Sequence, residues 1–205
     1  MREQIIEAIG LGIDDVRQIG TSGTNARLID EAQFQCSFYH HFNQNGYLAQ
    51  TESPVIQWIP SNGENPGTGG LPQCDLVLYP KKKNGQKVWM ELKVAGYALR
   101  GHSAWLHNND KRDKWEQDVN KLSNPAIAND IRAFVLISFF DFDYSGENEP
   151  NRRNMFRERI NAFIQENGLE DNDPGNDNPK TFDSLQWRGF ALYPRAWIWV
   201  WGEDN

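Results

Sequence analysis

The chain has 205 residues, a formal net charge of −7, and a composition that is 39% hydrophobic and 12% aromatic. This size suits one domain with a substantial core, and the negative charge argues against a surface that attracts polyanions over its whole area. Cys36 and Cys74 lie far apart and outside any CxxC motif, which excludes a multi-cysteine zinc site and favours two free thiols. The sequence has no apolar run of about 18 residues and no secretory leader, so we expect a soluble cytoplasmic protein without a membrane span.

The N-terminal part of the chain has the pattern of helices. Residues 2–9 and 13–18 predict two short helical pieces, separated by the glycines of a Gly-Leu-Gly sequence. A stronger helix is expected within residues 21–46, where Gly46 provides the stop. Its candidate N-caps are Ser22, Thr24 and Asn25. Its apolar stripe comprises Leu28, Ala32, Phe38, Tyr39 and Phe42.

Extended segments follow this helix. Residues 47–59 predict a strand bent at Pro54, and residues 60–73 form a loop rich in Gly, Pro and Asn. Residues 74–96 then read as a β-hairpin, with Asn84-Gly85 marking its turn.

The second half of the chain alternates helices and strands. Residues 108–122 predict a helix with Trp115, Val119 and Leu122 on one face, and residues 131–140 form a near-continuous apolar strand. A helix is expected within 151–168 and one or two strands within 190–202. The apolar face of that helix comprises Phe156, Ile160, Phe163 and Ile164.

The order of these elements predicts an α/β fold with a mixed β-sheet sandwiched by helices. A strand, a helix and a further strand usually form a parallel crossover, whereas the hairpin adds antiparallel neighbours. We expect a single domain over residues 1–205, with a core of about 25–140 and an elaboration at 150–202.

Charged residues stand at unusual positions in the hairpin. Asp75 begins one apolar strand, and Glu91 and Lys93 interrupt the other. Side chains alternate between the faces of a strand. In the second strand, one face therefore carries Trp89, Glu91 and Lys93. In the first strand, one face carries Asp75, Val77 and Tyr79, and the other carries Cys74, Leu76 and Leu78. Asp75 meets Glu91 or Lys93 only if the connecting loop has an odd number of residues.

Two adjacent buried carboxylates are costly unless they are paired, and a divalent cation relieves both their repulsion and their desolvation. Mg²⁺ prefers such oxygen ligands, and it makes a bound water easier to deprotonate. Lys93 beside that water could orient it, assist its deprotonation or stabilise charge on a phosphate. The alternative for Glu91 and Lys93 is a solvated ion pair on an exposed strand face.

The arrangement of Asp75 and Glu91-Leu92-Lys93, 16 residues apart, resembles the PD-(D/E)XK nuclease superfamily, although Cys74 replaces the proline of that motif. The resemblance implies a restriction endonuclease-like αβββαβ core. It also implies that Asp75, Glu91 and the main-chain carbonyl of Leu92 bind Mg²⁺, with Mn²⁺ as a substitute, and that Lys93 serves the attacking water. Glu31 on the preceding helix would complete the metal site, with Glu52 as its rival.

Basic side chains suggest where nucleic acid could bind. Arg100 and His102 follow the catalytic strand, Lys81 and Lys82 lie at the hairpin tip, and Lys114 shares a helix face with Asp118 and Lys121. For that helix face a solvated ion-paired surface is the alternative. The tryptophans at 197, 199 and 201 predict core packing, with a dimer surface or base stacking as alternatives.

These observations predict a Mg²⁺-dependent endonuclease that hydrolyses the phosphodiester bonds of DNA, with restriction or phage defence as a natural setting. Double-stranded DNA is the expected partner, and cutting both strands makes a homodimer reasonable. The alternative is a non-catalytic nucleic-acid-binding or assembly module that retains the nuclease fold. An unrelated α/β binding or structural domain is the third reading.

Overall fold

The computed structural model describes residues 1–21, 31–54, 73–83, 85–96, 109–139, 142–143, 158, 160–169, 179–187 and 190–202. The helices are α1 (Arg2–Thr21), α2 (Glu31–Gln44) and α4 (Asn109–Leu122), with the 3-10 helix η1 (Pro125–Ile127) and a helical segment at 160–166. The strands are β1 (Tyr47–Pro54), β2 (Gln73–Pro80), β3 (Val88–Gly96), β4 (Ile131–Phe139), β5 (Phe142–Asp143), β6 (Lys180–Thr181), β7 (Leu185–Trp187), β8 (Phe190–Leu192) and β9 (Arg195–Trp201).

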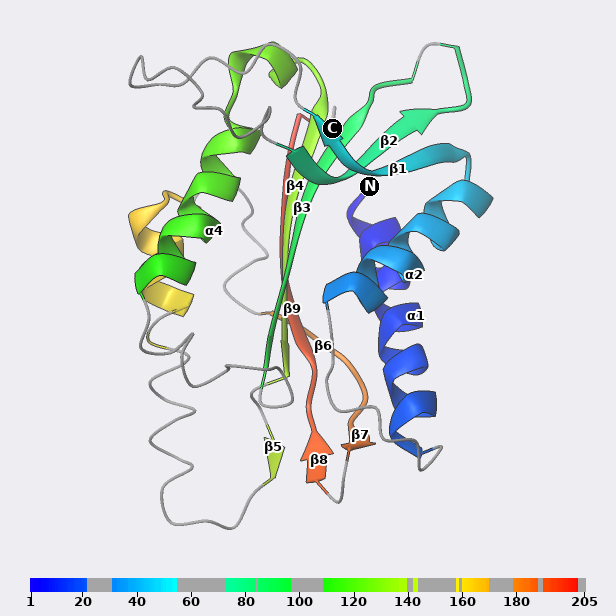
Figure 1. Cartoon of the computed structure of the whole chain (residues 1–205), viewed down its shortest axis with the longest axis vertical. Coiled ribbons are helices and arrows are strands. Elements are labelled where there is room, and N and C mark those ends of the chain that lie inside the picture. Colours follow the sequence, from blue (N-terminus) through cyan, green and yellow to red (C-terminus); the bar gives the residue numbers. More distant parts are fainter. Residues whose placement is uncertain are drawn as a thin grey trace.

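The fold is mixed α/β, as the sequence predicts. A six-stranded sheet has the order β1-β2-β3-β4-β9-β6, and β5, β8 and β7 form a smaller sheet. Strands β3 and β4 are parallel and are connected through α4, whereas the other paired neighbours are antiparallel. Figure 1 shows α4 on one side of the central strands and α1 and α2 on the other.

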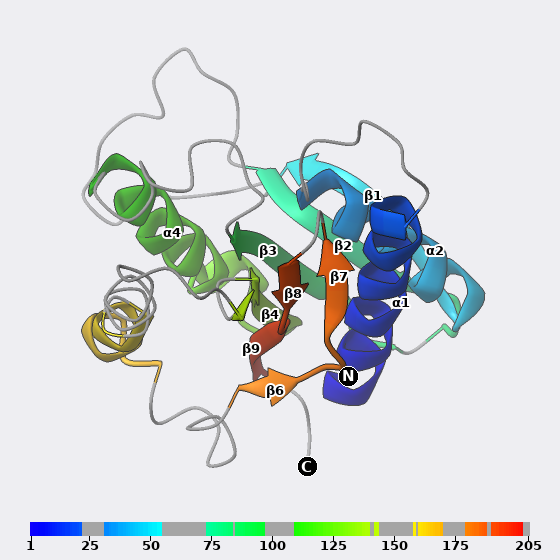
Figure 2. The same cartoon turned by 90° about the horizontal axis from the view of Figure 1, so that it is seen from below.

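Each face of the large sheet has its own apolar core. On one face, α1 and α2 pack through residues such as Ile9 and Phe38 against Leu78 and Met90. On the other face, Trp115 and Val119 of α4 pack with Phe134 of β4. Figure 2 shows the same two helical layers from below. The mostly apolar β4 thus separates two cores, which explains why its sequence lacks alternation.

The N-terminal region is one continuous helix, so the prediction of two pieces with a break at Gly10–Gly12 is wrong. Gly12 instead lies where α1 crosses α2: a Cβ atom there would meet Phe34 Cδ1 at 2.5 Å. A glycine inside a helix weakens the helix but permits close approach, and here tertiary packing outweighs the intrinsic preference.

Helix α2 confirms Gly46 as its stop, because Gly46 has a φ of 95° just beyond the helix. The predicted apolar stripe is only partly right. Phe38 and Phe42 are buried, but Tyr39 is 39% exposed, and Phe34 takes a core position that was not predicted. The stripe therefore follows the spacing 34, 38 and 42. Leu28 and the three N-cap candidates lie outside the described residues.

The C-terminal strands are integral to the sheet. Strand β9 lies between β4 and β6, and Trp197 and Trp199 are 8% and 1% exposed. Their predicted role in core packing is confirmed, and these two rings offer no dimer surface. The homodimer stays a prediction.

Within the described ranges, no helix is both long enough and apolar enough to cross a membrane. The cytoplasmic location stays a prediction.

Candidate active site

The predicted carboxylates meet where β2 and β3 separate. The two strands pair through Leu76↔Met90, Val77↔Trp89 and Leu78↔Val88, which places Asp75 opposite Glu91 in the same register. Residues 81–87 connect the strands, so the connection has the odd length that the chemical hypothesis required. It is longer than a tight Asn-Gly turn, and Asn84 itself lies outside the described residues.

Beyond the point where β2 stops pairing with β3, two carboxylates accept hydrogen bonds from the backbone of β3. Asp75 Oδ2 accepts a hydrogen bond of 2.8 Å from the Leu92 backbone N–H. Glu31, the first residue of α2, accepts one from the Val94 backbone. In a strand, the N–H and C=O of one residue point to the same neighbour, so the Leu92 carbonyl faces the same side as Asp75. This is the position that its predicted role as a metal ligand requires.

Lys93 lies at the centre of four carboxylates. Its Nζ atom is 3.0 Å from Asp75 Oδ2, 3.1 Å from Asp118 Oδ2, 3.7 Å from Glu31 Oε1 and 3.9 Å from Glu91 Oε2. The four predicted catalytic residues, Glu31, Asp75, Glu91 and Lys93, are therefore brought together. Their side chains come from α2, β2 and β3.

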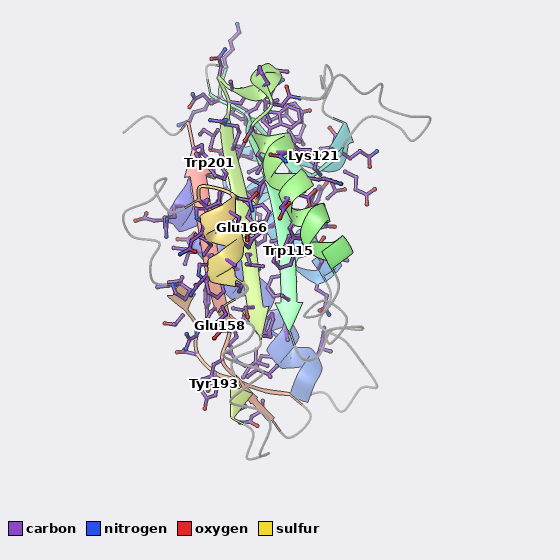
Figure 3. The ribbon with its side chains drawn as sticks, turned by 90° about the vertical axis from the view of Figure 1, so that its left-hand side faces the viewer. Trp115, Lys121, Glu158, Glu166, Tyr193 and Trp201 are labelled. Atoms are coloured by element: carbon purple, nitrogen blue, oxygen red, sulfur yellow. The ribbon has the colours of Figure 1, made fainter. Side chains whose placement is uncertain are left out.

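Helix α4 adds two residues that were not predicted as part of the site. Lys121 Nζ is 2.6 Å from Glu91 Oε1 and 2.6 Å from Asp118 Oδ1. Figure 3 faces this side of the sheet, with Lys121 and Trp115 labelled on α4. The sequence signal was present, because Asp118 and Lys121 lie three residues apart and directly precede the buried Val119 and Leu122, but the same pattern fitted a solvated ion pair. Side-chain exposures of 14% and 15% contradict that alternative.

Glu91 is the most deeply buried acid of the cluster. It is 0% exposed; Lys121 Nζ lies 2.6 Å from its Oε1 atom, and its Oε2 atom accepts no hydrogen bond from the described residues. This burial contradicts a solvated Glu91–Lys93 pair on an exposed face. Desolvation, followed by the charges of Asp75 and Asp118, raises the pKa of Glu91 well above its ordinary value.

Burial and the neighbouring charges also shift the pKa values of Glu31 and Lys93. Desolvation, helped by Asp75 and opposed by Lys93, raises the pKa of Glu31 to about 7. For Lys93, burial opposes the charge, but the four surrounding carboxylates outweigh it and raise the pKa above its ordinary value. Lys93 therefore stays an ammonium at neutral pH.

The donor set fits a hard divalent cation. Four carboxylates and two ammonium groups sum to −4 + 2 = −2 when all are ionised, which one divalent cation balances. The buried Oε2 atom of Glu91 also has no hydrogen-bond donor among the described residues. Across the described segments, no three His, Cys, Asp or Glu side chains are grouped as a metal site. Mg²⁺ does not require such a group, because one or two carboxylates, several waters and substrate phosphates can hold it.

Cys74 departs from the predicted strand alternation. It is buried in the core beneath α4, with Val77 and Trp89, instead of sharing a face with Leu76 and Leu78. The regular pairing of β2 with β3 ends at Leu76, and beyond it the thiol turns toward Glu91. Burial, then the charge of Glu91, raises the pKa of the Cys74 thiol. Both cysteines are free thiols, as predicted.

Glu52, the rival to Glu31, lies opposite Asp75 on β1. Thr51↔Leu76 and Ser53↔Cys74 are paired, whereas Glu52 is exposed and has a left-handed φ of 50°. Such a backbone is strained for a residue other than glycine. The structure favours Glu31 over Glu52, because Glu31 contacts Lys93 and β3.

The predicted nucleic-acid contacts are placed only in part. Lys81 and Lys82 are exposed, but they follow β2 at the end opposite Asp75, roughly 20 Å along the strand from the site. Lys81 also donates a hydrogen bond of 2.6 Å to the Asn43 carbonyl near the end of α2. This placement argues against a contact at the reacting phosphate. Arg100, His102 and the side chain of Lys114 lie outside the described residues.

Comparison of the chain with protein-family models, with curated proteins and with solved structures finds no significant match. The functional inference therefore depends on the geometry of the site.

Proposed function

We propose that this protein is a Mg²⁺-dependent endonuclease that hydrolyses phosphodiester bonds, with double-stranded DNA as its substrate. The observation that carries the proposal is the convergence of Glu31, Asp75 and Glu91 on Lys93 at the open edge of β3. The element order α2-β1-β2-β3-α4-β4 also supports a restriction endonuclease-like core.

The residues divide into cation ligands and charge-stabilising groups. Asp75, Glu91 and the Leu92 carbonyl would hold Mg²⁺, and Glu31 would complete or tune the site. Bound Mg²⁺ supplies a Lewis acid that polarises the phosphate and makes a water more acidic. Lys93, which stays protonated, is suited to stabilise negative charge on the phosphate and to orient the attacking water.

Glu31 and Lys93 differ in how they could serve the attacking water. A base works best when its pKa is near the working pH, and the pKa of Glu31 is raised to about 7. Lys93 is ill suited to that step, because its raised pKa leaves it no free lone pair at neutral pH. We therefore assign charge stabilisation to Lys93 and keep Glu31 as the residue that completes or tunes the metal site.

A cleavage assay tests the proposal. Purified protein is incubated with linear and circular duplex DNA, single-stranded DNA and RNA, in Mg²⁺, Mn²⁺ or EDTA. We expect metal-dependent cutting of duplex DNA that is abolished by Asp75→Ala, Glu91→Ala and Lys93→Ala, each checked for folding. The exposed Asp183→Asn and Lys180→Met are the matched controls and should cut as the wild type does.

Full activity in any of the three alanine variants contradicts the assignment. Binding of nucleic acid by the wild type without cutting in any metal instead favours the non-catalytic module. Cutting of RNA alone corrects the substrate class while keeping the chemistry.

A further inference from the structure

Lys121 has no donor left for a ligand. Its ammonium is 2.6 Å from Glu91 Oε1 and 2.6 Å from Asp118 Oδ1, and it donates a hydrogen bond of 2.9 Å to the Gln73 carbonyl. An ammonium has three N–H donors, and three oxygens of the protein match them. Lys121 thus joins α4 to the start of β2 and to the buried acid of β3, and it has no free N–H for a phosphate.

Asp118 links the two ammonium groups of the site. Its Oδ1 atom is the one that contacts Lys121, and its Oδ2 atom lies 3.1 Å from Lys93 Nζ. Asp75 and Glu91 are the acids assigned to the cation. Asp118 is therefore the carboxylate that remains close enough to hold the Lys93 ammonium in place.

We propose that Lys121 and Asp118 are positioning residues: Lys121 fixes the buried carboxylate of Glu91, and Asp118 fixes the ammonium of Lys93. Neither residue contacts the nucleic acid. This inference rests on the proposed nuclease function and assigns a role to α4 within it. The competing role for Lys121 is direct contact with a backbone phosphate.

Steady-state kinetics separate the two roles. A positioning residue acts on the chemical step, so Lys121→Met should lower kcat by about 10–100-fold while KM for duplex DNA stays within about twofold. Lys121→Arg, which keeps the charge, should restore part of the loss. A phosphate contact would instead raise KM and reduce the salt dependence of binding by about one ion. Asp118→Asn should lower kcat in the same way.

The controls remove a charge elsewhere. Lys180→Met and Asp183→Asn change exposed residues on or beside β6 and should leave kcat and KM unchanged. Circular dichroism and thermal unfolding establish that each variant is folded. If Lys121→Met does not fold, Lys121→Arg and Asp118→Asn carry the test, since neither leaves Glu91 without a cation.

A measurement without nucleic acid keeps this inference separable from the proposed function. In protein with ¹⁵N-labelled lysines, the ammonium signals of Lys93 and Lys121 are assigned through Lys93→Arg and Lys121→Arg. We expect Mg²⁺ to shift the Lys93 signal and to leave the Lys121 signal in place. Asp118→Asn should shift both signals before any Mg²⁺ is added.

The outcomes are distinct. A loss in kcat at constant KM supports the inference, whereas a raised KM at constant kcat, or wild-type kinetics in both variants, overturns it. If the wild type cuts nothing, the proposed function fails, and the roles of Lys121 and Asp118 are then tested by the ammonium signals of Lys93 and Lys121 alone. The expected Mg²⁺ response then supports the inference, and its absence overturns it.

Discussion

Lys93 lies within a dense cluster of charged side chains. Four carboxylate oxygens, from four different side chains, lie 3.0–3.9 Å from its Nζ atom. Unit charges about 4 Å apart interact by roughly 4 kcal/mol near a protein surface. A divalent cation held by Asp75 and Glu91 would draw on some of the same oxygens, so the ammonium and the metal weaken each other's binding.

Replacement of Lys93 should therefore uncouple metal binding from cleavage. We expect Lys93→Met to bind Mn²⁺ about tenfold more tightly or better, because a competing charge is removed, and to cut no DNA. Isothermal titration calorimetry without nucleic acid measures the affinity, with Lys180→Met as the control. Unchanged or weaker Mn²⁺ binding in Lys93→Met shows that the ammonium and the metal do not draw on the same carboxylates.

Glu31 predicts an unusual dependence of stability on pH. Its pKa is about 7 in the folded protein against an ordinary 4.5, so the folded state binds more protons between these values. The free energy of unfolding should therefore fall as the pH rises from about 4.5 to about 7. Glu31→Gln should lose this contribution and show a shallower slope, which urea unfolding in EDTA measures.

The control for this experiment is Glu3→Gln, an exposed position of α1 outside the cluster, which should keep the wild-type slope. The raised pKa of Glu91 acts in the same direction, so a residual slope is expected in Glu31→Gln. Equal slopes in the wild type and in Glu31→Gln argue against the burial of the Glu31 carboxyl.

At the scale of elements, the packing of α1 on α2 determines where Glu31 lies. Glu31 is the first residue of α2, and Phe34, one turn later, is 0% exposed beneath α1. Gly12 of α1 leaves room for that ring. The position of Glu31, a predicted site residue, thus depends on packing that a glycine in another helix permits.

Two glycines of α1 offer a matched pair of substitutions. Gly12→Ala places a methyl group 2.5 Å from Phe34 Cδ1, so we expect it to destabilise the fold by about 1–3 kcal/mol. Gly10 has no atom within 4 Å of the same methyl position, so Gly10→Ala should stabilise the helix by about 0.5–1 kcal/mol. Denaturant unfolding measures both, and equal effects of the two changes contradict the close helix crossing.

At the scale of the whole molecule, the charge cluster joins elements from both sides of the sheet. Helix α2 belongs to one layer and α4 to the other, and the separating strands β2 and β3 lie between them (Figure 1). A ligand that binds the folded state and not the unfolded state stabilises the folded state as a whole. A cation held by the cluster should therefore stabilise the entire domain.

Thermal unfolding in Mg²⁺ checks this consequence. With Mg²⁺ at about 100 times its dissociation constant, linkage adds about 2.7 kcal/mol, which corresponds to a rise in Tm on the order of 5–10 °C for a chain of this size. Asp75→Ala should lose the shift, whereas Asp183→Asn should retain it. A shift that persists in Asp75→Ala places the metal elsewhere.

The local patterns of the sequence determined most of the fold. Three features could be predicted because each depends on neighbours close in sequence: the near-continuous apolar run of β4, the helical spacing of Trp115, Val119 and Leu122, and the helix stop at Gly46. The charged positions of the hairpin also predicted the correct register. Side chains alternate between the two faces of a strand, so a shift of one residue in the pairing of β2 with β3 would place Asp75 on the opposite face from Glu91. The requirement that the two carboxylates meet therefore restricts the register.

Tertiary structure alone decided the remainder. Whether Gly12 breaks a helix or lets two helices approach depends on Phe34, which lies 22 residues after Gly12 in the sequence. Whether Asp118 and Lys121 form a solvated pair or complete a buried site depends on where α4 crosses β3. Helical spacing defines a face but not what covers it, because burial and electrostatic coupling arise only when distant segments pack together.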